Sequence, residues 1–190
     1  MVWIGLSGKK ESGKTTVTRT IQEARPWFEE RTFAGPLKEI VKIAFNWEDK
    51  NLIDGPDKET VDPRWGFAPR FPLQHMGTEY FRNTYDKWFW IKNLKHRLEK
   101  DKPTDLIISD VRFPEEIEFV RSQGGQVWRI DRPGHVNKDQ HVSETALDNR
   151  TDWDYLIVND GSLEDLKNKI LEKLKEIDPV EQDPEEAKWL

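Results

Sequence analysis

The residues with the clearest chemical meaning lie near the start of the chain, in the run Gly8-Lys9-Lys10-Glu11-Ser12-Gly13-Lys14-Thr15-Thr16. This run matches the pattern GxxxxGK[ST], which cradles phosphate groups when it lies between a strand and a helix. The context fits the pattern, because an apolar run at 2–6 precedes it and a helix-like segment at 17–24 follows it. The sequence therefore predicts a phosphate-binding loop.

Each residue type in this loop has a physical task. Gly8 and Gly13 permit backbone turns that a Cβ would obstruct, so that successive N–H groups point into one concavity. Lys14 supplies a positive charge to the β- and γ-phosphates, and Thr15 offers a hydroxyl to Mg²⁺. The helix that begins there presents free N–H groups and its positive dipole end to the anion. A nucleoside triphosphate with Mg²⁺ is the expected ligand.

Asp110 and Arg112 form a second group with chemical potential. They follow the apolar run Leu106-Ile107-Ile108, which predicts a buried strand at 105–110. Ligands of open parallel sheets lie beyond the carboxyl ends of the strands, so we expect both side chains beside the phosphate loop. A carboxylate there can hold the Mg²⁺ shell or a substrate hydroxyl, and an arginine can bind phosphate bidentately. The alternative is an ordinary Asp–Arg surface pair.

Basic residues outside the loop indicate a second anionic ligand. A triphosphate that is bound by the loop and Mg²⁺ needs few of them, yet the candidates are Lys38, Arg70, Arg82, Arg112 and Arg132. This surplus favours an acceptor that is itself phosphorylated. Such an acceptor needs no strong general base, because the second pKa of a phosphomonoester is about 6. For Lys38, the alternative is a solvated lysine at the start of a helix.

Polar residues also recur on one face of a predicted helix at 73–85. Gln74, Thr78 and Arg82 are four residues apart, and Gly77 thins the helix wall beside them. The same face carries Phe81. From spacing alone, this face is equally consistent with a binding wall and with a half-exposed surface.

Composition excludes several classes of protein. Charged and apolar residues each make up 35% of the 190 residues, and the net charge of -6 argues against binding to polymeric nucleic acid. The chain has no cysteine, and His135 and His141 have no further ligands at metal spacing, so we expect neither disulfides nor a zinc site. The first apolar run is too short for a signal peptide, and none approaches the ~20 residues that span a bilayer. We therefore expect a cytoplasmic protein without a membrane partner.

The order of the elements predicts an α/β fold. Apolar patterns predict strands at 2–6, 31–34, 105–110, 126–130 and 155–158, alternating with helices at 17–24, 35–45, 73–85, 88–100, 114–123 and 163–177. Such alternation indicates a parallel sheet with helical crossovers. We expect one domain at 1–178 that includes an irregular insertion at 46–70 and a lid-like loop at 132–144, followed by an acidic tail at 179–190. In the last helix, the apolar residues from Leu163 to Ile177 are expected to pack in the core.

A phosphate loop alone does not distinguish a switch, a motor and a kinase. A GTPase switch would carry a DxxG turn, but Asp110 is followed by Val111-Arg112-Phe113. It would also carry an NKxD guanine reader, and the nearest candidate, Asn137-Lys138-Asp139-Gln140, ends in glutamine. A chain of this length also lacks the additional elements of a motor or helicase. A kinase is favoured.

Five blocks of the chain, in order, resemble the bacteriophage deoxynucleoside monophosphate kinases. They are residues 8–16 and the runs Phe33-Ala34-Gly35-Pro36-Leu37-Lys38-Glu39, Leu73-Gln74-His75-Met76-Gly77-Thr78-Glu79-Tyr80-Phe81-Arg82, Ser109-Asp110-Val111-Arg112-Phe113-Pro114-Glu115-Glu116 and His141-Val142-Ser143-Glu144. The resemblance implies the P-loop nucleoside monophosphate kinase fold, with a five-stranded parallel sheet between two layers of helices. It also implies ATP with Mg²⁺ as the phosphoryl donor.

The resemblance further implies roles for particular residues. The ATP phosphates would lie on residues 8–16, and Mg²⁺ would be held by Thr15 and Asp110. The transfer centre would contain Lys14, Asp110, Arg112 and the lid arginine Arg132. The deoxynucleotide acceptor would contact Lys38, Arg70, Gln74, Thr78, Arg82 and Glu115, with Gln74 and Thr78 toward the base or sugar.

Other functions and partners stay open at this point. The runs 7–14, 34–39, 144–149 and 152–154 are also similar to the animal-type phosphomevalonate kinases, although the block at 73–82 favours the nucleotide acceptor. A non-catalytic nucleotide-binding protein would keep the loop without needing Asp110, Arg112 and Arg132. Tryptophans in polar surroundings, such as Trp47, Trp65 and Trp90, indicate a possible homodimer.

Overall fold

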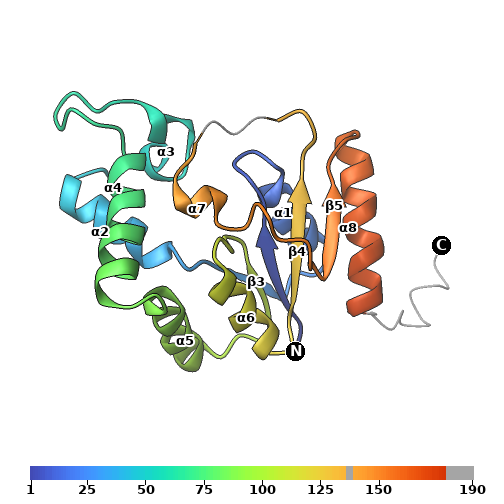
Figure 1. The fold of residues 1–190 in the computed structure, drawn as a ribbon. Coiled ribbons are helices and arrows are strands. Elements are labelled where there is room, and N and C mark those ends of the chain that lie inside the picture. Colours follow the sequence, from blue (N-terminus) through green and yellow to red (C-terminus); the bar gives the residue numbers. More distant parts are fainter. Residues whose placement is uncertain (136–138, 179–190) are drawn as a thin grey trace.

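The apolar runs of the chain form the strands of one sheet in the computed structural model, which describes residues 1–135 and 139–178 (Figure 1). The strands are β1 (Trp3–Ser7), β2 (Phe28–Arg31), β3 (Asp105–Ile108), β4 (Gln126–Asp131) and β5 (Tyr155–Val158). Every strand pairs in parallel with its neighbours, in the order β2-β3-β1-β4-β5. The predicted five-stranded parallel sheet is confirmed.

Helical segments connect these strands. They are α1 (Lys14–Ala24), α2 (Gly35–Phe45), α3 (Lys50–Ile53), the 3₁₀ helix η1 (Pro56–Glu59), α4 (Arg70–Gln74), the π-helix η2 (His75–Tyr85), α5 (Phe89–Asp101), α6 (Pro114–Ser122), α7 (Val142–Thr145) and α8 (Leu163–Ile177). No helix in the described ranges combines the length and the apolar character that crossing a bilayer requires.

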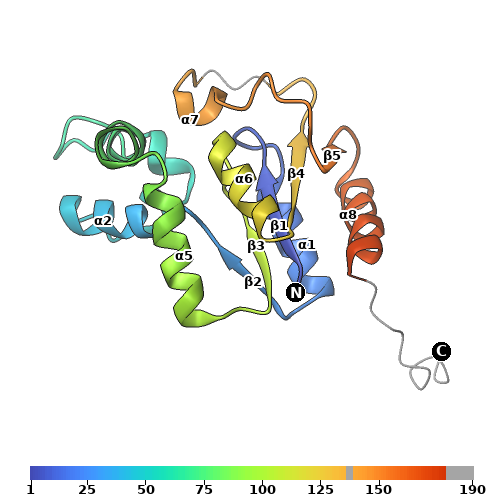
Figure 2. The same ribbon diagram turned by 60° about the horizontal axis from the view of Figure 1, so that its bottom comes forward.

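Alternation along the strands gives the sheet two apolar faces. Ile4 and Ile107 belong to one core, which α1 and α8 cover. Trp3, Leu106 and Ile108 belong to a second core on the opposite face, which α5 and α6 cover. Figure 2 shows α8 and α6 on opposite sides of the sheet. The fold therefore has three layers, as the family resemblance implied.

The second strand lies earlier than the sequence predicted. It pairs from Phe28 opposite Asp105 to Arg31 opposite Ile108, instead of covering residues 31–34. Phe28 is buried in the core, whereas Glu29 and Glu30 are exposed on this outer strand, so the run lacks a clear apolar alternation. Phe33 comes after the strand and is left free to line a cavity.

The segment 46–70 is more ordered than the sequence predicted, because it contains α3 and η1. Trp47 is fully buried there, and its Nε1 donates to Asp62 Oδ2 at 2.6 Å. Trp90 is also buried, whereas Trp65 is 43% exposed. Trp47 and Trp90 are core residues, so the expectation that they form a dimer patch is wrong; a homodimer itself stays a prediction.

The predicted helix at 73–85 begins earlier, as α4, and continues as a π-helix. Gly77 lies in this π-helix, where a Cβ would be 2.6 Å from Leu37 Cδ2 of α2. Its carbonyl accepts a hydrogen bond of 2.8 Å from Trp90 Nε1 of α5. These contacts join α2, η2 and α5 into one wall beside the sheet (Figures 1 and 2).

The last helix was predicted to pack in the core through an apolar stripe, and an acidic tail was predicted after it. Leu163 is 61% exposed, so the apolar stripe of the last helix begins only at Leu166, which is buried with Ile170 and Leu174. Leu163 lies in the first turn of α8. The predicted acidic tail at 179–190 lies outside the described residues.

Carboxylates hold the chain in place where β3 ends. Asp110 accepts hydrogen bonds from the main-chain N–H groups of Phe33 and Ala34 at 2.8 and 2.9 Å. Glu116 accepts from the N–H groups of Arg112 and Phe113 at 2.6 and 3.1 Å. Burial, reinforced by the charge of Asp110, raises the pKa of Glu116 to about 8. At neutral pH, Glu116 is therefore mostly protonated.

The pKa of Glu116 predicts a pH dependence of stability. The pKa rises from 4.5 to about 8 on folding. Between these values the folded state holds a proton that the unfolded state has lost, so this group lowers stability as pH rises, by up to about 1.4 kcal/mol per pH unit. Glu116→Gln keeps an oxygen acceptor but does not titrate.

We therefore expect Glu116→Gln to lose less stability than the wild type between about pH 5 and about pH 8. Urea unfolding across this range measures the difference, and Glu118→Gln, which changes an exposed residue of the same helix, is the control. Equal pH slopes for the wild type and Glu116→Gln would show that Glu116 is ionised in the folded protein.

Candidate active site

The loop between β1 and α1 has the geometry that its motif predicts. Lys14 Nζ donates to the carbonyl oxygens of Gly8 and Lys9 at 2.6 and 2.7 Å. A Cβ on Gly8 would lie 2.5 Å from Ser12 Oγ, and Gly13 has a φ of +115°, which favours glycine. Ser12 Oγ is buried without a hydrogen-bond partner in the described part of the chain. The loop thus holds an unused hydroxyl that suits an oxygen-rich ligand.

A hollow adjoins the loop on the side of β4 and β5. Arg132, which follows β4, donates from Nη1 to the carbonyl of Glu11 at 3.2 Å. Asn159, which follows β5, donates from Nδ2 to the carbonyl of Ser12 at 2.9 Å. The hollow is lined by Glu11, Gly13, Lys14, Thr15, Thr16, Arg132, Asn159, Gly161, Leu163 and Leu166. Arg132 and Thr15 therefore lie where a nucleotide bound to the loop would extend.

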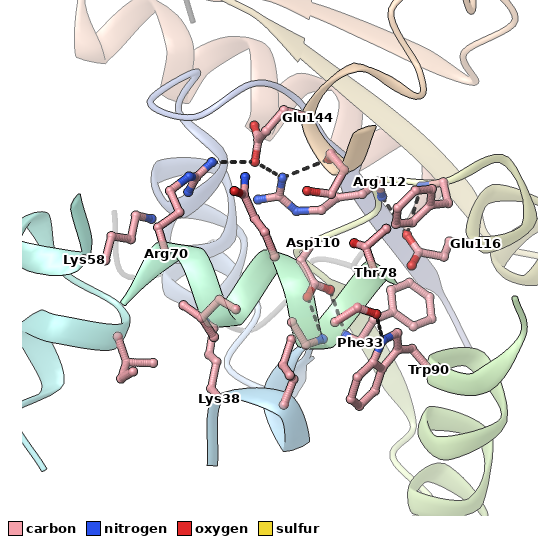
Figure 3. A pocket seen from close by; sticks show the side chains of 18 of the residues that line it. Phe33, Lys38, Lys58, Arg70, Thr78, Trp90, Asp110, Arg112, Glu116 and Glu144 are labelled. Atoms are coloured by element: carbon pink, nitrogen blue, oxygen red, sulfur yellow. Dashed lines mark hydrogen bonds and ion pairs between the residues drawn. The ribbon is translucent and has the colours of Figure 1, made fainter. Parts of the chain in front are cut away.

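A second and deeper space, about 200 Å³ in volume, lies between the sheet and the α2–η2 wall (Figure 3). We call it the acceptor cavity, after the ligand that the sequence predicts for several of its lining residues. Its apolar lining consists of Phe33, Ala34, Leu37, Ile53, Leu73, Gly77, Trp90 and Phe113, and its polar lining of Lys38, Asp54, Lys58, Arg70, Gln74, Thr78, Asp110, Arg112, Glu116, Ser143 and Glu144. The aromatic side chains supply flat surfaces, and Glu144, Arg70 and Arg112 lie together at one end of the cavity.

A buried carboxylate gathers cations at one end of this cavity. Glu144, whose side chain is 2% exposed, accepts from Arg70 Nη2 at 3.0 Å and also from Arg112 Nη1 on the same oxygen. Lys9 Nζ donates to its main-chain carbonyl at 2.6 Å. Figure 3 shows Arg70 and Arg112 converging on Glu144 from two sides. Because Lys9 belongs to the phosphate loop, this end of the cavity adjoins the loop.

The charges in this region shift the pKa values of their neighbours. Burial raises the pKa of Glu144, but Arg112 and Arg70 outweigh it, so the pKa of this carboxyl lies below its ordinary value. Burial, with the charge of Arg112, lowers the pKa of Lys14 to about 7. Arg112 therefore acts electrostatically on both the loop and the cavity.

Six of the predicted site residues line the acceptor cavity: Lys38, Arg70, Gln74, Thr78, Asp110 and Arg112. Lys38 Nζ donates to Asp54 Oδ1 at 2.5 Å, and Gln74 Nε2 donates to Asp139 Oδ2 at 2.7 Å. Thr78 is buried at 4% exposure, so its hydroxyl faces the interior instead of solvent. Gln74 and Thr78 of this helix face therefore line a cavity, and their role in binding stays a prediction.

Arg82 and Glu115 do not line this cavity. They bind each other, with Arg82 Nε 3.0 Å from Glu115 Oε1, and the Arg82 guanidinium lies 4.1 Å from the centre of the Phe113 ring. The π-helix turns Arg82 away from the line of Gln74 and Thr78, because residues four apart are not in register in this wider helix. Arg82 thus packs on the outer side of an aromatic residue that lines the cavity.

The two predicted Mg²⁺ ligands, Thr15 and Asp110, line different spaces. Thr15 is exposed in the hollow beside Arg132, whereas Asp110 lines the acceptor cavity and uses both oxygens on the N–H groups of Phe33 and Ala34. Among the residues that the structure describes, no three acidic or histidine side chains form a metal-binding group. A metal here would draw most of its ligands from the bound nucleotide and water.

The structure adds Lys58, Glu116 and Glu144 to the lining of the cavity, and no separate role was predicted for these residues. Glu116 follows Pro114 in the first turn of α6, a pattern typical of a helix start, and this signal was present in the sequence. Glu144 and Lys58 lie in the segments 132–144 and 46–70, which lack periodicity. Only tertiary structure brings them to the cavity.

The sequence of the chain is similar to those of known deoxynucleotide monophosphate kinases. Residues 65–170, more than half of the chain, match the family model described as deoxynucleotide monophosphate kinase. A putative deoxynucleotide monophosphate kinase of Acanthamoeba polyphaga mimivirus is 35% identical over 187 residues, which cover 90% of this chain and 95% of the relative. The deoxynucleotide monophosphate kinase of Enterobacteria phage T4 is 34% identical over 118 residues, or 60% of this chain and 48% of the phage protein.

A solved structure supports the fold. The shikimate kinase of Aquifex aeolicus superposes with a TM-score of 0.53 at 17% identity, covering 91% of this chain and 96% of the kinase. At this identity the likeness concerns the fold alone, and it agrees with a P-loop kinase arrangement of sheet and helices. With the family match and the mimivirus relative, it leads to one conclusion: the chain belongs to the deoxynucleotide monophosphate kinase family.

Proposed function

We propose that this protein transfers the γ-phosphoryl group of ATP to a deoxynucleoside 5′-monophosphate and so forms the diphosphate. One observation carries the proposal: the phosphate loop adjoins the cation-lined end of the acceptor cavity, because Lys9 of the loop donates to the main chain of Glu144 and the charge of Arg112 acts on Lys14. Two phosphorylated ligands can therefore meet end to end. A protein that only binds one nucleotide does not need the second cation group.

The acceptor cavity suits a mononucleotide. Phe33, Trp90 and Phe113 supply flat apolar surfaces for a base, and Gln74 and Thr78 supply hydrogen-bonding groups near it. The opposite, cationic end suits a phosphate. Phosphomevalonate has no ring that would use the aromatic surfaces, so this acceptor has less support.

The donor nucleotide would occupy the loop and the hollow beside β4 and β5. Its β- and γ-phosphates would contact the main-chain N–H groups of the loop, Lys14 and the free hydroxyl of Ser12. Its nucleoside would extend past Thr16 toward Asn159 and Gly161, with Arg132 beside the phosphates. The hydroxyl of Thr15 would contribute to a Mg²⁺ shell that the phosphates and water complete, and the metal would neutralise phosphate charge.

The reaction needs positioning and charge more than proton transfer. An oxygen of the acceptor phosphate forms a bond to the γ-phosphorus while the bond from that phosphorus to the β-phosphate oxygen breaks, which gives ADP and a deoxynucleoside diphosphate. The attacking oxygen is already ionised near neutral pH. Lys14 and Arg112 would offset the charge on the transferring group. Asp110 would hold the start of α2 in place at the acceptor side, and its role toward the metal stays a prediction.

Three further expectations about the protein's setting are proposals as well. The substrates are small nucleotides, so no polymeric nucleic acid and no membrane is needed as a partner. The cytoplasm, of the host if the chain is phage-encoded, is the compartment where ATP and deoxynucleotides meet. The chain from 1 to 178 would act as a single domain.

The function is tested by a coupled assay of ADP release with ATP–Mg²⁺ and each of the four common deoxynucleoside monophosphates. We expect turnover with at least one of them and none with phosphomevalonate. Arg112→Ala should reduce kcat by at least about a hundredfold, because a preorganised charge at a transferring group contributes several kcal/mol. Its unfolding midpoint and circular dichroism check that the fold is retained. Full activity of Arg112→Ala would remove this residue from the transfer centre.

The low pKa of Lys14 predicts proton uptake when ATP binds. With a pKa of about 7, Lys14 is mostly neutral at about pH 8 in the free protein. The phosphates favour its charged form and raise its pKa, so binding at this pH should take up close to one proton. Calorimetric titrations in two buffers of different ionisation enthalpy measure this number.

Lys14→Arg is the matched control, because arginine keeps the charge but stays protonated at this pH. Its binding enthalpy should lack most of the buffer dependence of the wild type. Identical buffer dependence for the two proteins would place the proton on another group.

A further inference from the structure

Lys58 differs from the other cations of the acceptor cavity in its bonding. Lys38 is paired with Asp54, and Arg70 and Arg112 are both paired with Glu144. Lys58 makes no hydrogen bond or ion pair with any described residue, although it lines the same cavity. Among these four side chains, only the ammonium group of Lys58 has no hydrogen-bond acceptor in the described part of the protein.

The surroundings of Lys58 do not favour a positive charge. The side chain is half-buried on η1, and burial is the main cause that lowers its pKa. The charges of Arg70, Lys10 and Arg112 lower it further, and Glu59 only partly opposes them. Figure 3 shows Lys58 beside Arg70 at the cationic end of the cavity. A buried ammonium among like charges is costly unless an anion joins it.

The carboxylates at this end of the cavity are paired with other cations. Glu59 pairs with Lys10 and Arg70, and Asp139 pairs with Arg70. Glu144 receives Arg70 and Arg112 on one oxygen, and its backbone carbonyl receives Lys9. A phosphomonoester carries up to two negative charges and three terminal oxygens. Such a group at this end of the cavity could receive Lys58 without releasing the two arginines from Glu144.

We propose that Lys58, carried by the segment 46–70, binds the phosphate of the deoxynucleoside monophosphate and so sets the preference for phosphorylated acceptors. The inference rests on the proposed function, and it gives this segment a task at the substrate side. Lys58 is a phosphate-binding residue here, whereas the aromatic lining of the cavity receives the base. The ammonium is a compact point charge, so it recognises the phosphate without reading which base is attached.

The proposal predicts a loss that depends on the phosphate of the ligand. Lys58→Met removes the charge, keeps a similar chain length and leaves no carboxylate without its partner. Because a hydrogen bond to a charged group contributes more than a neutral one, KM for the monophosphate should rise about tenfold to a hundredfold. KM for ATP should stay within about twofold. Binding of the corresponding deoxynucleoside, which lacks the phosphate, should be unchanged by calorimetry or by inhibition.

Two variants give this experiment its controls. Lys58→Arg keeps the positive charge and should recover most of the affinity for the monophosphate. Lys42→Met removes a lysine of α2 that pairs with Glu39 outside the cavity and should change neither KM. Unfolding midpoints establish that all three variants are folded.

Two results would overturn the role of Lys58. One is a wild-type KM for the monophosphate in Lys58→Met, and the other is an equal loss for monophosphate and deoxynucleoside, which indicates a structural role. Failure of the proposed function looks different, because the wild type itself would then phosphorylate no deoxynucleoside monophosphate. The comparison of ligands with and without phosphate still measures the contribution of Lys58 in that case.

Discussion

The site depends on one buried carboxylate, that of Glu144, which holds Arg70 and Arg112 together. These residues come from α7, α4 and the end of β3, three parts of the chain that are distant in sequence. Two guanidinium groups near each other repel, and a charge removed from water is stable only when it is paired. Glu144 supplies the pairing, and Arg112 and Arg70 hold its pKa low despite burial, so it stays ionised at neutral pH. Asp139 also pairs with Arg70 at 2.6 Å, so protein carboxylates hold both arginines at this end of the cavity.

A second set of contacts fixes the walls around this charged centre. Asp110 ties the start of α2 to the end of β3 through the N–H groups of Phe33 and Ala34, so the aromatic ring of Phe33 is held at the cavity. On the opposite wall, the lack of a side chain at Gly77 lets η2 approach Leu37 of α2. Catalysis of phosphoryl transfer relies on positioning, and a rigid acceptor cavity supplies it.

The parts of this site that could be predicted from sequence are the residues that directly follow an apolar strand in the chain. The phosphate loop and the pair Asp110 and Arg112 follow apolar strands directly, so the rule for parallel sheets was enough to place them. Arg82 was expected on one face with Gln74 and Thr78 because an ordinary α-helical spacing was assumed, whereas the segment forms a π-helix and Arg82 pairs with Glu115. Lys58 and Glu144 lie in segments without periodicity, and only tertiary contacts bring them to the site. The second strand was predicted at 31–34 instead of 28–31 because its exposed glutamates, Glu29 and Glu30, obscure the alternation of apolar and polar residues.

The cations of the phosphate loop and of the cavity repel one another, so an anion bound at one place would favour binding of an anion at the other. Burial and the charge of Arg112 lower the pKa of Lys14, so the cations of the loop and the cavity repel each other. An anion at either site relieves that repulsion and makes charging of the other site easier. Two phosphates placed end to end also repel each other, and the cation between them offsets that repulsion. In the proposed reaction, Arg112 would therefore couple donor and acceptor through charge, without requiring a change of shape in the cavity.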